Sequence, residues 1–347
     1  SICMPLALHA KKKQRLMKAL LTGVHLRALL RKDLSICQGG IMNLSEIINL
    51  ELPRKFSPLH SQFEIEFDPD SKTIWSWLNP LGIPCFTPAL LSGIRAHDSM
   101  LEANNGFITH DGALHKANYY VVGSRVAGIF NFGGDLALFL MLIRSGERDA
   151  LARYASLCID NIYPRIKNYF CPTLTTISLI QGDALGGGFE TALASDILIA
   201  EESAQMGLPE ILFNLFPGMG AYSLLARRIG TRQAEQLITS GKIHSARKMH
   251  EMGVVDVLVP DGHGKKAVED WICANQRRRN GFQAVMGARN CVDPIERNEL
   301  DKITDLWVDA AMRLEERDLK MISRIVRSQT RRMDNNTPIA DGATVAA

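Results

Sequence analysis

A glycine-rich segment at residues 180–190, Ile-Gln-Gly-Asp-Ala-Leu-Gly-Gly-Gly-Phe-Glu, constrains the fold more than any other part of the chain. The preceding run, 173–179, is apolar and β-branched and predicts a buried strand, whereas residues 191–195 predict a helix. Three consecutive glycines at a strand-to-helix junction let the backbone approach another group closely. The free amides that open the helix can hold negative charge. We expect Glu190, in the first helical turn, to project into the same space.

Glycine clusters also occur in tight turns, in phosphate-binding loops and in dinucleotide-binding motifs. An ordinary tight turn is the simplest of these. A phosphate-binding loop does not fit, because no Gly-Lys-Ser/Thr follows Gly188, and the spacing also differs from the Gly-x-Gly-x-x-Gly dinucleotide fingerprint. Two neighbours distinguish the segment from a turn. A Gly-Gly-Asp sequence lies upstream at 133–135, and a second carboxylate, Glu210, follows Glu190 within Gly-Leu-Pro-Glu.

With these segments the sequence resembles the crotonase (enoyl-CoA hydratase/isomerase) superfamily over roughly residues 60–330. Phe-Gly-Gly-Asp-Leu at 132–136 is similar to the family loop Ala-Gly-x-Asp-Leu, with Phe132 where alanine is common. Gly-Leu-Pro-Glu at 207–210 and Pro-Gly-Met-Gly at 217–220 extend the match. The resemblance implies an α/β fold, a ββα spiral with a C-terminal helical layer, and assembly as a trimer or a dimer of trimers.

The resemblance also implies a catalytic site that needs no cofactor or metal. The backbone amides of Gly134 and Gly187 would form an oxyanion hole for a thioester carbonyl, each worth about 3 kcal/mol. Glu190 and Glu210 would converge on the same pocket, where one handles water and the other shuttles the proton at the α-carbon. One would then be protonated while the other is charged. The alternative is that either glutamate is a surface helix residue. Asp135 is expected to cap a helix.

Two residues of the C-terminal helices are further candidates for the site. Trp307 and Ile325 fall in helices that, in this superfamily, cover the acyl pocket. Core packing is the main interpretation for each, and lining of the substrate pocket is the alternative. The arginine run at 277–279 could meet a phosphorylated carrier arm, although a solvated charge run is the simpler interpretation.

Composition argues against several other classes of protein. The 347 residues can hold one large domain with an appendage, or two modest domains. Seven cysteines without a Cys-x-x-Cys pair, and nine scattered histidines, argue against a disulfide framework or a zinc site and favour a reducing cytoplasm. Residues 1–41 hold eight Lys or Arg against one Asp, so the rest of the chain is mildly acidic although the net charge is +3. Nucleic acid is therefore not an expected partner.

The patterns along the chain divide it into four regions. Residues 1–41 form a basic appendage that need not belong to the working enzyme, with an amphipathic membrane or partner helix as the alternative. Residues 42–260 form the crotonase-like ββα core, in which strands alternate with helices. Residues 261–333 are helical in pattern, and residues 334–347 are polar or small and predict a disordered tail. The predicted strands of the core are 63–67, 73–78, 118–122, 173–179, 196–200 and 254–259.

Within the superfamily, the two glutamates and the segments at 131–136, 142–148 and 152–154 are similar to the bacterial diffusible-signal-factor synthases. That resemblance implies dehydration of a 3-hydroxyacyl thioester, usually on acyl carrier protein. Hydrolysis of the thioester would then release a cis-2-unsaturated fatty acid, a quorum-sensing signal. It also implies a sensor histidine kinase as partner.

Two alternatives to a signal synthase remain. An enoyl-CoA hydratase of fatty-acid metabolism would use the same fold but needs a site for the CoA nucleotide, which the sequence does not reveal. A non-catalytic binding partner of a sensor kinase is the other alternative. The intact Glu190, Glu210, Gly134 and Gly187 count against it.

Overall fold

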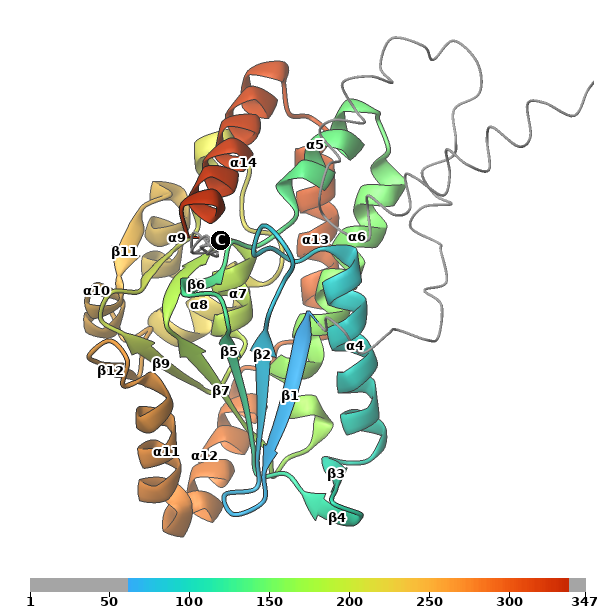
Figure 1. Cartoon of the computed structure of the whole chain (residues 1–347). Helices are drawn as coiled ribbons and strands as arrows, with labels where there is room; N and C mark the ends of the chain where they lie inside the picture. The colour runs from blue at the N-terminus through green and yellow to red at the C-terminus, as the bar shows by residue number, and fades with distance from the viewer. Residues whose placement is uncertain (1–61, 337–347) are drawn as a thin grey trace, which may run out of the picture.

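Two sheets, built from strands that alternate with helices, dominate the part of the chain that a computed structural model describes, residues 62–336 (Figure 1). The predicted appendage at 1–41, the start of the predicted core at 42–61, and residues 337–347 lie outside this range. The predicted α/β class with a C-terminal helical layer is confirmed.

The larger sheet has the strand order β1-β2-β5-β7-β9-β12. Its strands are β1 (Phe63–Asp68), β2 (Thr73–Leu78), β5 (Tyr119–Ser124), β7 (Thr175–Ile180), β9 (Ile197–Glu201) and β12 (Val257–Val259). β1 pairs with β2 antiparallel and every other pair is parallel. Each parallel pair requires a crossover connection, which explains why helices separate these strands in the sequence.

Helices cover both faces of this sheet. Figure 1 shows α4 and α6 on one side and α11 and α12 on the other. The helices of the described residues are α4 (Pro88–Ala103), α5 (Leu136–Arg144), α6 (Arg148–Ile166), α7 (Gly187–Leu193), α8 (Ala221–Ile229), α9 (Thr231–Ser240), α10 (Ala246–Glu251), α11 (Gly264–Asn275), α12 (Arg279–Val292), α13 (Arg297–Ala311) and α14 (Glu316–Asn336), with 3-10 turns η1 (Asn168–Phe170), η2 (Pro209–Phe213) and η3 (Gln276–Arg278).

The central strand β7 shows how the sequence specifies this double cover. All six of its residues are buried. Ile177 and Leu179 pack with Val268 and Ile272 of α11, whereas Ile180 belongs to the apolar cluster that includes α4 and α6. Successive side chains of a strand point to opposite faces, so both faces of β7 are covered. Its buried polar residues Thr176 and Ser178 are hydrogen-bonded to Asp196 and Ser195.

A smaller sheet, in the order β11-β10-β8-β6, contains strands that the sequence analysis did not predict. They are β6 (Gly128–Asn131), β8 (Gly182–Leu185), β10 (Gln205–Gly207) and β11 (Ile243–Ser245), and a further unpredicted hairpin consists of β3 (Phe107–His110) and β4 (Ala113–Lys116). Gly182 pairs with Gly128, and a Cβ on Gly182 would overlap the Gly128 backbone. Strands this short, with glycine at the contact, have no alternating pattern to detect.

Two helix ends differ from the prediction. The amphipathic pattern of residues 147–170 predicts one helix, but α6 continues through Pro164 and ends at Ile166. The three residues 168–170 have φ between 50° and 55°, which a right-handed helix cannot contain. α14 extends to Asn336, so residues 334–336 are helical where the sequence predicted the tail to begin.

The last two helices, α13 and α14, pack on the end of the core that carries α5 (Figure 1). α13 buries Leu300, Trp307 and Val308 there, and α14 buries Leu319 and Ile322. No helix between residues 62 and 336 is long and apolar enough to cross a membrane.

Candidate active site

The loop between β6 and α5 holds the Gly134 amide in a fixed direction. The Phe86 amide donates a hydrogen bond to the carbonyl of Gly133 (2.8 Å), and the Gly133 amide donates to Asn131 Oδ1 (2.7 Å). The C=O and N–H of one peptide plane point in opposite directions. Because Phe86 binds the Gly133 carbonyl, the Gly134 N–H must therefore point away from it.

Tyr154 of α6 clamps the same loop from the other side. Its hydroxyl donates to the carbonyl of Phe86 (2.6 Å) and accepts a hydrogen bond from the Asp135 amide (3.1 Å). Asp135 itself caps α5, since its Oδ1 accepts from the Leu138 amide at 3.0 Å, as the sequence predicted. The loop is thus held on both flanks of Gly134.

A second glycine-rich loop brings the Gly187 amide beside that of Gly134. The Gly186 amide donates to Gly207 O (2.9 Å), and Gly187 is the first residue of α7. A Cβ on Gly133 would lie 2.6 Å from the Gly187 nitrogen, and one on Gly187 would lie 3.4 Å from the Gly134 nitrogen. Gly133, at φ 92°, also has a backbone conformation that side chains disfavour. Only glycine allows these two amides to approach so closely.

Glu190 lies one turn into α7 with its carboxyl group held by a neighbouring turn. Its Oε1 accepts hydrogen bonds from the amides of Met219 (2.8 Å) and Ala221 (3.0 Å), and the residue is 1% exposed. Burial raises the pKa of Glu190 above its usual range, and the two amide donors oppose part of that rise.

Glu210, in η2, faces the same space. Its Oε2 is buried and has no hydrogen-bond partner among the described residues. Its Oε1 lies close to the second loop, because a Cβ on Gly186 would be 2.5 Å from it. Burial raises the pKa of Glu210, and the charge of Glu190 raises it further. Two neighbouring carboxyls that both resist ionisation can hold a shared proton, so this pair can supply one acid and one base.

All six residues predicted for the site line one cavity. Gly134, Gly187, Glu190 and Glu210 lie at its polar end, and the C-terminal helices contribute Trp307 and Ile325. The remaining walls are mainly apolar: Phe132, Leu136, Phe139, Leu185, Phe213, Leu215 and Met219. The cavity therefore combines an apolar binding space with a small group of converging polar atoms, which is typical of a small-molecule site.

Trp307 both packs in the core and lines the cavity, the two interpretations that the sequence left open. Only 4% of it is exposed, and its ring packs edge-on against Phe139 at 5.1 Å between centroids. It also fits against Gly218, where a Cβ would overlap the indole. Ile325 is partly buried against the core and lines the cavity as well.

Two residues of the site were not predicted from the sequence. Met219 lines the cavity and supplies an amide to Glu190. The sequence contained a signal for it, since the Pro-Gly-Met-Gly segment was part of the family resemblance. Tyr154 lies in the segment 152–154 that carried part of the resemblance, but its role had no signal, because its partners Phe86 and Asp135 are distant in sequence and only the fold brings them together.

Comparison with known proteins identifies the family of this fold. The model of the enoyl-CoA hydratase/isomerase family matches residues 117–289. A probable mitochondrial enoyl-CoA hydratase 2 from Arabidopsis thaliana is 37% identical over 180 residues, which is 52% of this chain and 56% of the relative. The α subunit of the fatty acid oxidation complex of Pseudomonas syringae pv. tomato is 36% identical over 131 residues, 38% of this chain. The match covers only 18% of that much longer relative.

Solved structures show the same fold. An enoyl-CoA hydratase from Bacillus halodurans superposes with a TM-score of 0.61 at 18% identity, over 76% of this chain and all of the other. DspI from Pseudomonas aeruginosa superposes with a TM-score of 0.53 at 21% identity, over 82% of this chain and all of the other. The predicted crotonase-like architecture is thereby confirmed. With this domain at its centre, the chain belongs to the crotonase (enoyl-CoA hydratase/isomerase) superfamily.

Proposed function

We propose that this protein removes water from a 3-hydroxyacyl thioester carried on acyl carrier protein, and then hydrolyses the thioester to release a cis-2-unsaturated fatty acid signal. One observation supports the proposal above all. Two buried carboxyls with raised pKa values line the same cavity as two closely spaced glycine amides.

The dehydration step uses the carboxyl pair as base and acid. The thioester oxygen accepts hydrogen bonds from the Gly134 and Gly187 amides. The ionised carboxylate of the Glu190–Glu210 pair takes the proton from C2, and negative charge moves to the thioester oxygen as an enolate. The protonated carboxyl gives its proton to the C3 hydroxyl, the C3–O bond breaks, and water leaves. Each oxyanion donor contributes about 3 kcal/mol, and positioned acid–base groups contribute about 10²–10⁴-fold in rate.

The hydrolysis step uses the same groups again. A carboxylate of the pair takes a proton from water while the water oxygen attacks the thioester carbon. The tetrahedral oxyanion occupies the same amide pair, because charge develops on the same oxygen as in the enolate. The C–S bond then breaks, the protonated carboxyl gives a proton to the leaving sulfur, and the free acid departs.

The test is to incubate the purified full chain with a medium-chain 3-hydroxyacyl-carrier protein and to analyse the products by mass spectrometry. We expect a free 2-unsaturated acid without any added thioesterase. Glu210→Gln should lose this activity. Glu235→Gln is the matched control, because Glu235 is an exposed glutamate whose partner is Tyr222 on the surface. Reversible hydration of enoyl thioesters without cleavage would refute the synthase proposal.

An enoyl-CoA hydratase of fatty-acid metabolism is the second candidate. The names of the curated relatives favour it, since they include a probable enoyl-CoA hydratase and fatty acid oxidation subunits. It would hydrate enoyl-CoA and leave the thioester intact. A chain that turns over neither substrate while remaining folded would instead fit a non-catalytic partner of a sensor histidine kinase. Trimeric assembly and a cytoplasmic location stay predictions.

A further inference from the structure

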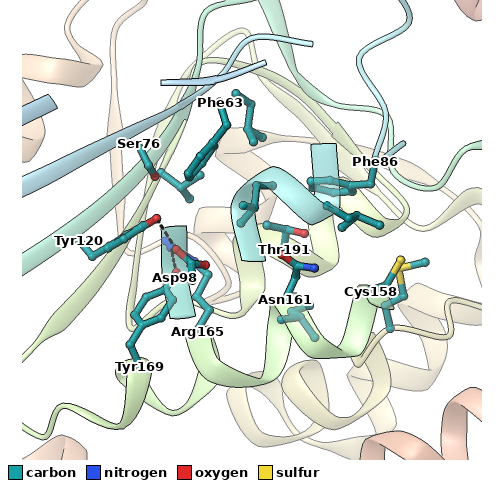
Figure 2. A pocket seen from close by; sticks show the side chains of 16 residues that line it. Phe63, Ser76, Phe86, Asp98, Tyr120, Cys158, Asn161, Arg165, Tyr169 and Thr191 are labelled. Carbon is teal, nitrogen blue, oxygen red and sulfur yellow. Dashed lines mark hydrogen bonds between the residues drawn. The ribbon is translucent and has the colours of Figure 1, made fainter. Parts of the chain in front are cut away.

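A second cavity lies between α4, α6 and the face of the larger sheet formed by β2 and β5 (Figure 2), and it shares the lining residue Met219 with the first. Most of its lining is aliphatic or aromatic, including Leu78, Leu91, Ile94, Val122 and Ile162. Cys158 adds to this apolar surface, because burial raises the pKa of its thiol and keeps it neutral. The sequence contained no indication of such a space.

This cavity adjoins the first one at Met219, next to Glu190. Met219 lines both cavities, and its amide donates to Glu190 Oε1 at 2.8 Å. Thr191, the next residue after Glu190 on α7, also faces the second cavity, as does Phe86, which holds the Gly133 carbonyl. The Met219 side chain therefore lies between the two spaces. Methionine is unbranched and flexible, so it can move aside for a ligand at little cost.

The far end of the second cavity holds two charged side chains, Asp98 and Arg165, that are buried and hydrogen-bonded. Asp98 is 1% exposed and its Oδ1 accepts from the Tyr120 hydroxyl at 3.0 Å. Arg165 is 4% exposed and donates to the Tyr169 hydroxyl (3.2 Å) and to Ser195 Oγ (2.8 Å). Figure 2 shows Tyr120, Asp98, Arg165 and Tyr169 together at one end, with Phe86 and Cys158 at the other. A hydrocarbon that reached this network would have to displace hydrogen-bonded charges, which is costly.

We propose that the second cavity receives the distal alkyl end of the substrate acyl chain, with Met219 moving aside and the Asp98–Arg165 end setting the maximum chain length. The inference rests on the proposed function and adds to it where the acyl chain lies and which residues limit its length. Each methylene that enters an apolar cavity increases affinity by about fourfold. Affinity should therefore rise with chain length until the chain meets the polar end, and then stop rising.

The test measures binding without relying on turnover. The probes are S-(2-oxoalkyl) pantetheine ketones of increasing alkyl length, which keep a carbonyl for the amide pair but cannot be hydrolysed. Calorimetric titration of the wild-type full chain should show affinity rising about fourfold per methylene over the medium chain lengths. An affinity that does not depend on chain length would overturn the proposal even if the protein proves to be a dehydratase. Conversely, affinity that depends on chain length would support the proposal even if the protein lacks thioesterase activity.

A substitution that fills the second cavity, with a matched control, tests whether the acyl chain binds there. Ile94 is a partly buried residue of α4 that lines the second cavity, so Ile94→Phe should fill it. We expect at least a tenfold loss of affinity for the longest bound chain and no change for the shortest. Met100→Phe is the matched control, because Met100 lies on the same helix but is 60% exposed. It should bind all probes as the wild type does.

Two further variants distinguish this path of the acyl chain from a path along α14. Ile94→Ala enlarges the cavity, should favour longer chains, and keeps the test decisive if Ile94→Phe fails to fold. Ile325→Phe narrows the catalytic cavity along α14 instead. If Ile325→Phe shortens the preferred chain and neither Ile94 variant alters it, the chain runs along α14 and the proposal is wrong.

Discussion

Replacing Glu190 by glutamine should abolish activity while making the protein more stable at alkaline pH. The Oε1 of Glu190 accepts from two backbone amides, and the glutamine carbonyl oxygen can accept the same two hydrogen bonds. The substitution is nearly isosteric, so no cavity forms. What it removes is a carboxyl group whose pKa burial has raised.

The sign of the stability change follows from that pKa. In an unfolded chain a glutamate has a pKa of about 4.3. Since the folded value is higher, the native state binds more protons than the unfolded state above that pH, and its stability falls as the pH rises. Each pKa unit corresponds to about 1.4 kcal/mol. Even a rise of one unit therefore predicts that Glu190→Gln gains about 1.4 kcal/mol at pH 8 and nothing at pH 4, or about 2–4 °C in Tm at the higher pH.

The dehydration rate of Glu190→Gln should fall, although its stability rises. Glutamine can neither take nor give the proton, so we expect dehydration to fall by about 10²–10⁴-fold. The assay combines single-turnover dehydration with thermal melts of both proteins at pH 4 and pH 8, and uses Glu235→Gln as the surface control. A variant that lost activity and also melted several degrees lower at pH 8 would refute the reasoning, because unfolding would then explain the loss.

Four further predictions concern the same cavity and the chain outside it. The kcat profile should be bell-shaped and displaced above the pH range of free carboxylates, because burial raises the pKa of both Glu190 and Glu210; a profile with limbs near about pH 4 would contradict this. Tyr154→Phe removes the hydroxyl that binds the Asp135 amide and the Phe86 carbonyl. It should lower kcat about tenfold with KM unchanged, less than the 10²–10³-fold expected when an oxyanion donor is lost, and an unchanged kcat would show that the loop does not need these hydrogen bonds. Gly187→Val should prevent turnover, because a Cβ at position 187 would lie 3.3 Å from Gly133 Cα and from Met219 Sδ. Normal kinetics of this variant would show that the Gly187 amide does not take part in the reaction. Deletion of residues 1–41 should leave the steady-state rate largely unchanged, whereas a large loss of rate or of soluble protein would show that this segment belongs to the enzyme.

The sequence predicted the parts of the site that depend on local chemistry. The glycines at 186–188 and the first-turn Glu190 lie within one short segment, where spacing along the chain determines what can meet. The α/β class followed from predicted strands that alternate with helices and from the family resemblance. Trp307 was placed near the acyl pocket by resemblance, and it lines the cavity that Glu190 shares.

The remaining features depend on contacts between distant segments. β6 and β8 pair through Gly128 and Gly182, residues without side chains and hence without a hydrophobic pattern. The role of Tyr154 arises because its hydroxyl meets Phe86, 68 positions away in the sequence. The second cavity is defined by helices and strands that only the fold brings together. The pairing of β6 with β8, the contacts of Tyr154 and the second cavity have no period along the chain that a single sequence could reveal.

The contact between Trp307 and Gly218 bears on how this chain can be recombined with its relatives. The predicted boundary near residue 260 separates the sheets from the C-terminal helices, and chimeras are commonly joined at such a boundary. Here the indole of Trp307, on α13, packs against Gly218, which has no side chain. The next residue, Met219, donates its amide hydrogen bond to Glu190. The hydroxyl of Thr304 binds the Gly218 carbonyl at 3.1 Å, so the same helix also grips the turn itself. Exchanging the C-terminal region without the turn at 217–220 would therefore displace Glu190, so a chimera should take both segments from the same parent.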